Sequence, residues 1–429
     1  MKSPTLKTFF ANSSILALGF LNSALLSRWL GPSGRGEVAA AMLWPPLLVS
    51  LAGAGLIPAT LYFSAKPDSK GESVFGNAVL LACAQSVVVL PITFLALHWL
   101  LRSQSPEVVS AARAYLFVIP AILVSQYELS LLQGRMHFST YNALRSVIPV
   151  GYVAGVVLLK LLGHLIVWNI VFLHLGLNLA VMFGAMSALR RKGIRTSLRV
   201  DLPLLKEMLK FGGKVQVGDV SQGMNLRLDQ ALMAAWLPAA DLGLYVVAVG
   251  AASASQVLAN AVRIVTTPRM TRKDSVAERT DTLRLVFKKF WVLATLVTLL
   301  IGLALPMLIP FIFGSRFSGS VLAAEILLVG NLFVGAKEVL TGGAHALGNP
   351  WLASRAELAA LAVTFGLLPI LLPTLGITGA AIASAASYAT VLVLIVYGLN
   401  RSYSIAPRAL FRFRAEDLRT LLPRTSDGN

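Results

Sequence analysis

The stretch WLGPSGRG at residues 29–36 decides the fold, because a related stretch, WLPAADLG, stands at residues 236–243, 207 residues later. The identities that align are Trp29 with Trp236, Leu30 with Leu237, and Gly36 with Gly243. Further along, Gly134 matches Gly348 and Gly163 matches Gly376 at almost the same offset. This order of matches indicates that the chain contains two copies of one architectural unit.

The composition places both copies in a lipid bilayer. Hydrophobic residues make up 56% of the 429 residues and charged residues 13%, with a mean hydropathy of +0.74. One soluble core cannot bury so much apolar surface. A crossing helix needs about 20 mostly apolar residues. Twelve segments meet that requirement, near residues 9–30, 38–63, 76–101, 109–132, 143–162, 165–189, 211–237, 242–265, 288–312, 320–345, 355–373 and 377–399.

The expected fold is therefore an all-α polytopic membrane protein with two six-helix lobes. An even number of crossings makes the lobes parallel repeats, related by an axis along the membrane normal. We place the N-terminal lobe at 1–189 and the C-terminal lobe at 211–399. Residues 190–210 form a basic connection in which Asp201 caps an amphipathic interfacial helix. Residues 400–429 form a basic tail.

Charge sets the expected orientation. If the N-terminus is cytoplasmic, most of the 37 Lys and Arg residues lie on the inner side, as the positive-inside rule requires. The C-terminus is then cytoplasmic as well. The same rule accounts for the net charge of +18 without nucleic acid, since the basic residues flank crossings. Anionic membrane lipids are the expected partners of these residues.

Charged residues within expected crossings are the candidate site residues, because each costs about 2.5 to 3.5 kcal/mol at mid-membrane. Arg28, Arg227 and Lys337 could bind a phosphate group, and the planar fork of arginine suits phosphate. Three acidic residues could bind a coupling ion or pair with these cations: Glu128, Asp229 and Glu338.

An alternative interpretation of these charges remains open. Arg227 or Lys337 would then neutralise Asp229 or Glu338, and Arg28 would extend its charge to the interface. Neither interpretation implies catalysis. The five histidines lack metal-ligand spacing and the chain has no Gly-x-x-x-x-Gly-Lys loop for a nucleotide. We therefore expect no metal, no cofactor and no enzymatic activity, and an ion gradient or the membrane potential as the energy source.

Several short motifs together carry a family resemblance: residues 26–36, 228–230, 241–245, 313–317 and 376–381. With these motifs the chain resembles the polysaccharide flippase (Wzx-like) family of the multidrug, oligosaccharidyl-lipid and polysaccharide exporter superfamily. The resemblance implies a transporter that moves undecaprenyl-diphosphate-linked oligosaccharides from the inner to the outer leaflet of the bacterial cytoplasmic membrane. It also implies association with other polysaccharide assembly proteins. O-antigen, exopolysaccharide and capsule precursors are all admissible substrates.

Two rival functions are weighed against this one. A cation-coupled multidrug exporter of the same superfamily would have the same twelve crossings, but more acidic residues in its first lobe than Glu128 alone. An oligosaccharide polymerase or ligase would need a large outer loop. The longest outer connection, near residues 101–108, is only a few residues long.

Overall fold

The structure is a computed structural model in which every regular element described is a helix. The residues that it describes are 4–53, 55–66, 71–194, 196, 198–256, 259, 262, 275–349 and 351–412. The end of the eighth expected crossing, the basic stretch at 263–274 and most of the basic tail lie outside the described residues.

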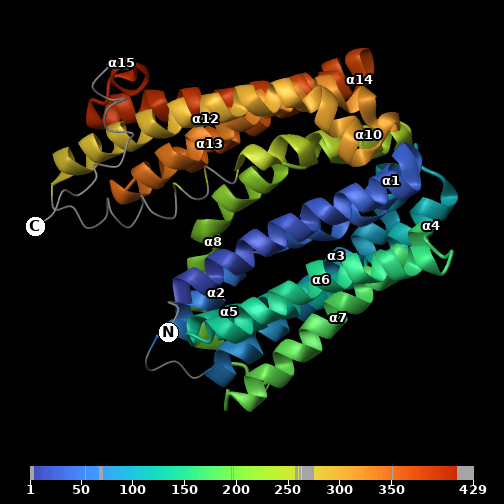
Figure 1. Cartoon of the computed structure of the whole chain (residues 1–429). Helices are drawn as coiled ribbons and strands as arrows, with labels where there is room; N and C mark the ends of the chain where they lie inside the picture. The colour runs from blue at the N-terminus through green and yellow to red at the C-terminus, as the bar shows by residue number, and fades with distance from the viewer. Residues whose placement is uncertain are drawn as a thin grey trace, which may run out of the picture. The chain divides into compact units, whose positions relative to one another are not determined.

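Figure 1 shows the order of the helices along the chain. Their bounds are α1 Pro4–Ala52, α2 Leu56–Ala65, α3 Gly71–Leu100, α4 Pro106–Tyr115, α5 Val118–Gly134, α6 Phe138–Leu161, α7 Val167–Arg191, α8 Leu202–Asn225, α9 Leu228–Trp236, α10 Ala239–Ala252, α12 Val276–Phe313, α13 Val321–Ala346, α14 Trp351–Tyr403 and α15 Pro407–Phe411. Two single 3-10 turns are Ser253–Ser255 and Ser315–Ser320.

The second, fourth and seventh expected crossings each extend over two helices, the eighth runs beyond the described residues, and the others largely coincide with helices or with parts of α1 and α14. Eight of the described helices are long and apolar enough to cross a membrane. The helix α1 contains the first crossing and part of the second, joined at Gly31, where φ is 69°. The helix α14 contains the last two crossings, joined at Gly376, where φ is 57°. Glycine tolerates such angles, so the chain turns without ending its helix.

Two compact units emerge from the packing, and each is described by itself. The first consists of residues 1–247 together with 312–317. In it, α5, α6 and α7 run side by side (Figure 1), α1 packs on α6, and α2 packs on α5. The helix α8 also belongs to this unit and contacts α2. Its first turn is capped by Asp201, whose carboxylate accepts a hydrogen bond from Leu204 N at 3.0 Å, and the helix then continues to Asn225.

The second unit contains residues 248–311 and 318–429. Its core joins Phe287 and Phe290 of α12 to Leu340 of α13 and Ile395 of α14. The short helix α15 adds Phe411, which meets the Phe287 ring edge-on. Close packing of α13 on α12 depends on small residues, as is usual between membrane helices. A Cβ on Gly343, for example, would lie 2.5 Å from the Leu283 side chain.

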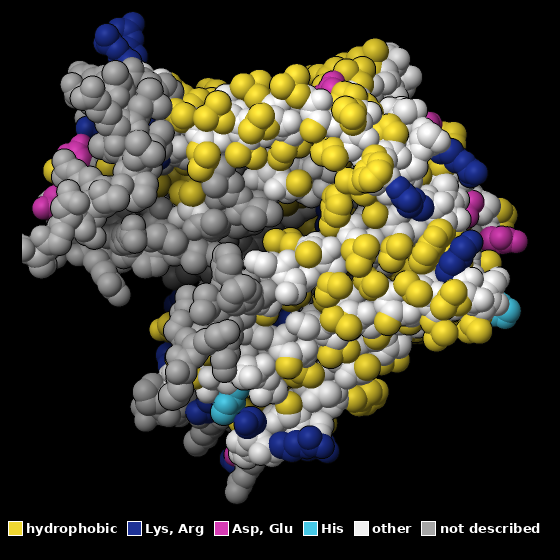
Figure 2. Space-filling model, in the orientation of Figure 1, with side chains coloured by type: hydrophobic (Ala, Val, Ile, Leu, Met, Phe, Trp, Pro, Cys, Tyr) yellow, Lys and Arg dark blue, Asp and Glu magenta, His cyan; other side chains and the backbone are white. Residues whose placement is uncertain are grey.

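The outer surfaces of the long helices are apolar. Figure 2 shows hydrophobic side chains over the helix shafts, with Lys and Arg mostly towards the helix ends. Leu303, Met307 and Phe311 of α12 are 81%, 79% and 74% exposed. Such a surface is stable against lipid and not against water.

Candidate functional site

Unwound backbone interrupts the first unit between α1 and α2. The Gln216 side chain of α8 stabilises this break: its amide nitrogen donates to Ser50 O at 2.8 Å and to Leu51 O at 3.1 Å, and its oxygen accepts from Gly55 N. Gln85 of α3 donates to Ala52 O at 2.8 Å. Freed backbone groups at membrane depth need such partners. A pocket of 270 Å³ borders the break.

A second break divides the seventh expected crossing. The helix α8 ends at Asn225 and α9 begins at Leu228, so Arg227 occupies the N-cap position of α9. Arg227 is exposed, whereas Asp229 in the next turn is 2% exposed. The Asp229 carboxylate accepts hydrogen bonds from Gln230 N at 2.7 Å and from the Tyr245 hydroxyl at 2.5 Å. The N-terminal end of a half-helix favours negative charge nearby.

Beside Arg227 lies a cluster of polar side chains, the tyrosine–histidine cluster, made of Tyr115, Tyr152, His174 and Asn178. His174 Nδ1 lies 2.7 Å from the Tyr115 hydroxyl and 3.0 Å from Asn178 Nδ2. The Tyr115 hydroxyl and the Asn178 side-chain amide thus contact the same ring nitrogen of His174. The Tyr152 ring packs edge-on against His174 with centroids 5.1 Å apart.

Two arginines interact with this cluster from different elements. Arg227 interacts electrostatically with Asp229 of the following turn and with Tyr115, and the interaction with Asp229 is the pairing that the second interpretation of the sequence expects. Arg35, in α1 just after Gly31, interacts electrostatically with Tyr152. Its Nε atom is buried, and no described residue makes a hydrogen bond with it. On sequence grounds Arg35 counts only as an outer basic residue. A basic residue within the repeated stretch was the signal that could have identified it.

The candidate acidic residue of the first lobe, Glu128, is fully buried in α5. Neither carboxylate oxygen has a hydrogen-bond partner among the described residues. A buried polar group without a partner costs free energy, so Glu128 is a candidate for binding a proton or a cation. Glu128 is not brought into the tyrosine–histidine cluster by any contact described.

The second unit holds the other two candidates in an ion-pair group. Lys337 of α13 is 5% exposed. Its ammonium pairs with the Glu357 carboxylate of α14 and lies 3.5 Å from the Glu338 carboxylate. The pairing with Glu338 is one of the two interpretations that the sequence allows, whereas Glu357 was missed. Lys337 is thus bound by two carboxylates of its own unit.

The remaining candidate, Arg28, lies near the bend of α1. It is exposed, and its Nε donates to Ile312 O at 2.7 Å. Just beyond it, the two repeated stretches meet. A Cβ on Gly36 would lie 1.6 Å from Ala239 O, and one on Gly243 would lie 2.0 Å from Pro32 O. The equivalent glycines of the two copies therefore allow direct contact between the two backbones.

The described residues contain no group of three His, Cys, Asp or Glu side chains that could hold a metal ion. The polar side chains among the described residues can form hydrogen bonds and ion pairs. An exposed arginine at the N-terminal end of a helix is an arrangement that can bind an anion.

Comparison with known proteins places the chain in a family. The profile described as "Polysaccharide biosynthesis protein" matches residues 5–273, which is more than half of the chain. The chain belongs to this family. Among curated protein sequences, none is significantly similar to it. The family membership confirms the resemblance drawn from the short motifs.

Several solved structures have a similar fold. A lipid II flippase, MurJ, in an inward closed conformation is 15% identical with a TM-score of 0.73, over 97% of this chain and 89% of that chain. An inward-facing multidrug resistance transporter of the MATE family and MOP superfamily is 16% identical with a TM-score of 0.73, over 90% of this chain and 93% of that one. The MATE multidrug transporter DinF-BH is 18% identical with a TM-score of 0.61, over 96% and 98%.

These likenesses show the fold. The expected all-α, multi-pass membrane architecture with about twelve crossings is confirmed. The family is described by a role in polysaccharide biosynthesis, and one structure with a similar fold belongs to a transporter of the MOP superfamily.

Proposed function

We propose that this protein is a flippase for undecaprenyl-diphosphate-linked oligosaccharides, which it moves from the inner to the outer leaflet of the cytoplasmic membrane by alternating access. The family supports a role in polysaccharide biosynthesis, and one protein of the same fold is a lipid II flippase. Both termini are cytoplasmic in this proposal, and the lobes 1–189 and 211–399 rock against each other. The substrate is a precursor of a surface polysaccharide, received from other assembly proteins.

The observation that carries this proposal is the position of Arg227. An arginine that is exposed within a membrane segment must face water or an anionic partner, because its desolvation is costly. Arg227 stands at the N-terminal end of α9, beside Tyr115. The guanidinium group of Arg227 and the N-terminal end of α9 together favour a diphosphate. Arg28 and Arg35 supply further positive charge from α1.

Lys337 has a different role in this proposal. Its pairing with Glu357 and Glu338 neutralises it in place, so we assign it to charge pairing and not to the diphosphate. Asp229 orients the start of α9 through its hydrogen bonds. No nucleotide hydrolysis is needed, since each negative charge carried outward gains about 2.3 kcal/mol per 100 mV of inside-negative potential.

The test is a flipping assay in vesicles with a fluorescent polyprenyl-diphosphate saccharide. Accessibility of the label on the outer leaflet gives the rate. We expect Arg227→Gln to slow flipping by about tenfold or more, because charge-assisted hydrogen bonds to phosphate are lost. Lys160→Gln, at the exposed end of α6, serves as the matched control and keeps the wild-type rate. Equal rates for Arg227→Gln and wild type, with equal protein in the vesicles, would remove Arg227 from the substrate site.

A second function is favoured by one observation. The buried Glu128 carboxylate, without a described partner, is what a cation-coupled exporter would use. Vesicles that hold a pH or sodium gradient separate the two functions. Uptake of a cationic dye that depends on the gradient and disappears in Glu128→Gln would identify an exporter. Flipping of the saccharide lipid without dye uptake would identify the flippase.

A further inference from the structure

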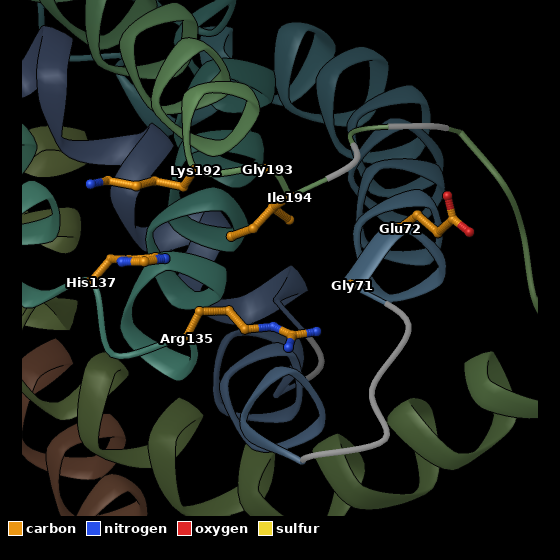
Figure 3. A pocket seen from close by; sticks show the side chains of 7 residues that line it. All are labelled: Gly71, Glu72, Arg135, His137, Lys192, Gly193 and Ile194. Carbon is orange, nitrogen blue, oxygen red and sulfur yellow. The ribbon is translucent and has the colours of Figure 1, made fainter.

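A separate basic pocket lies in the first unit, at the opposite end of that unit from the break between α8 and α9. It has a volume of 470 Å³. Three parts of the chain border it: the start of α3, the loop between α5 and α6, and the residues after α7. Figure 3 shows the lining residues Gly71, Glu72, Arg135, His137, Lys192 and Ile194 around an open space. None of these residues belongs to the site described above.

The pocket is positively charged. Arg135 and Lys192 line it together with His137. Among the described lining residues, the acidic one is Glu72; its carboxylate points away from the open space (Figure 3) and faces Arg199 at 4.0 Å. Gly71 lets the guanidinium approach the start of α3, because a Cβ there would lie 3.3 Å from Arg135 Nη2. The helices α3 and α6 begin here, and their N-terminal ends add to the positive potential.

The surroundings place this pocket at the depth of lipid headgroups. It lies where α3, α5, α6 and α7 each have one end, so apolar shafts adjoin it on the membrane side. Met136 stands between Arg135 and His137 and is 72% exposed, and Leu198 in the following segment is 70% exposed. Exposed apolar side chains next to basic ones are typical of a surface that contacts a membrane interface.

We propose that this pocket binds the phosphate of an anionic phospholipid headgroup, with Arg135 as the principal contact and the exposed Lys192, whose ammonium points to the outer side of the pocket in Figure 3, at its rim. An anionic phosphodiester complements the two cations, and its acyl chains can lie along the apolar shafts beside Met136. The site is distinct from the one that would bind the transported diphosphate. Its occupancy ties the first unit to the inner leaflet of the membrane.

Binding is measured on the full chain in a neutral detergent, by titration with dihexanoyl phosphatidylglycerol, dihexanoyl phosphatidylcholine or inorganic phosphate. The readout is the rise in melting temperature, from which an apparent Kd follows. We expect phosphatidylglycerol to stabilise the protein and phosphatidylcholine to do so far less. Arg135→Gln and Lys192→Gln should each weaken phosphatidylglycerol binding about tenfold, since each removes charge-assisted hydrogen bonds.

The matched control is Arg190→Gln. Arg190 lies at the same end of α7 as Lys192, is exposed, and donates to Thr196 Oγ1 at 3.0 Å without lining the pocket. We expect the Kd of the Arg190→Gln variant for phosphatidylglycerol to stay within about twofold of the wild-type value at physiological salt, because distant charges are then screened. Melting temperatures without lipid show whether each variant is folded.

Three results would overturn the proposal. The first is equal stabilisation by the two lipids, and the second is equal binding by wild type and by both pocket variants. In the third, inorganic phosphate stabilises as strongly as phosphatidylglycerol, which would make a soluble phosphate compound the ligand. Flipping is not measured, so failure here leaves the proposed transport function untouched.

Discussion

At the residue scale, the most consequential group is Lys337 between two carboxylates. A buried ion pair contributes little net stability, but breaking one leaves an uncompensated charge. The sequence predicts that these charges need partners, and it cannot name Glu357. That residue is 20 positions away on the next helix, and only the packing of α13 on α14 brings the two side chains together.

Replacing Lys337 by Met should therefore cost about 3–5 kcal/mol in the free energy of unfolding. The reason is that Glu357 loses its counter-charge in the core of the second unit. The double variant Lys337→Met with Glu357→Leu should lose less, because neither charge then remains in that pair. Denaturant titration in detergent micelles measures both. Lys160→Met, an exposed control, should change the free energy by no more than about 0.5 kcal/mol. A Lys337→Met protein as stable as this control would contradict the pairing.

At the element scale, some helix interruptions can be predicted from the local sequence, whereas others depend on side chains from distant helices. Proline and glycine signal departures from straight helix, and the bends at Gly31 and Gly376 occur in such segments. In the crossing 38–63 the sequence predicts interruptions at Pro45, Pro46 and Pro58, but α1 continues through the first two and ends at Ala52, before α2 begins at Leu56. What stabilises this break is Gln216, a side chain from α8, and long-range partners of this kind are not visible in a local pattern.

Gln216→Leu should destabilise the break between α1 and α2. Its three hydrogen bonds go to backbone groups, and leaving such groups unsatisfied costs about 1–3 kcal/mol. We expect a lower melting temperature and faster proteolysis near residue 55. Gln126→Leu is the matched control: Gln126 lines the same pocket but is exposed. If Gln216→Leu and Gln126→Leu have the same melting temperature, the side-chain amide of Gln216 does not stabilise the break.

The contact between the repeated stretches gives a second prediction for elements. Gly36→Ala would place a methyl group against the Ala239 carbonyl, which the two backbones can accommodate only by separating. A clash in close packing costs about 1–3 kcal/mol. Gly176→Ala in α7 meets nothing within 4 Å and should be neutral or slightly stabilising. We expect a lower melting temperature for Gly36→Ala alone. Equal melting temperatures for Gly36→Ala and Gly176→Ala would show that Gly36 does not closely approach the Ala239 carbonyl in solution.

At the scale of the whole molecule, the apolar content and its spacing were enough to predict an all-helical membrane protein, because lipid admits few other spanning structures. The site was less accessible to sequence reasoning. Arg28, Arg227 and Glu128 were selected because charges are rare in crossings, but Arg35 and the tyrosine–histidine cluster were missed. Tyrosine and histidine are ordinary in apolar segments, and only the packing of α4, α6 and α7 assembles them.

The orientation of the whole chain is the last prediction. The positive-inside rule puts Lys192 in the cytoplasm and Lys160, at the opposite end of α6 from His137, on the outer side. Both side chains are exposed. The native thiol, Cys83, is first replaced by Ser, and Lys192→Cys or Lys160→Cys is then introduced. In intact cells, a membrane-impermeant maleimide should label only the cysteine at position 160, and after permeabilisation it should label both. Labelling of position 192 in intact cells would reverse the assigned direction, and with it the side on which the proposed flippase receives its substrate and on which the basic pocket meets lipid.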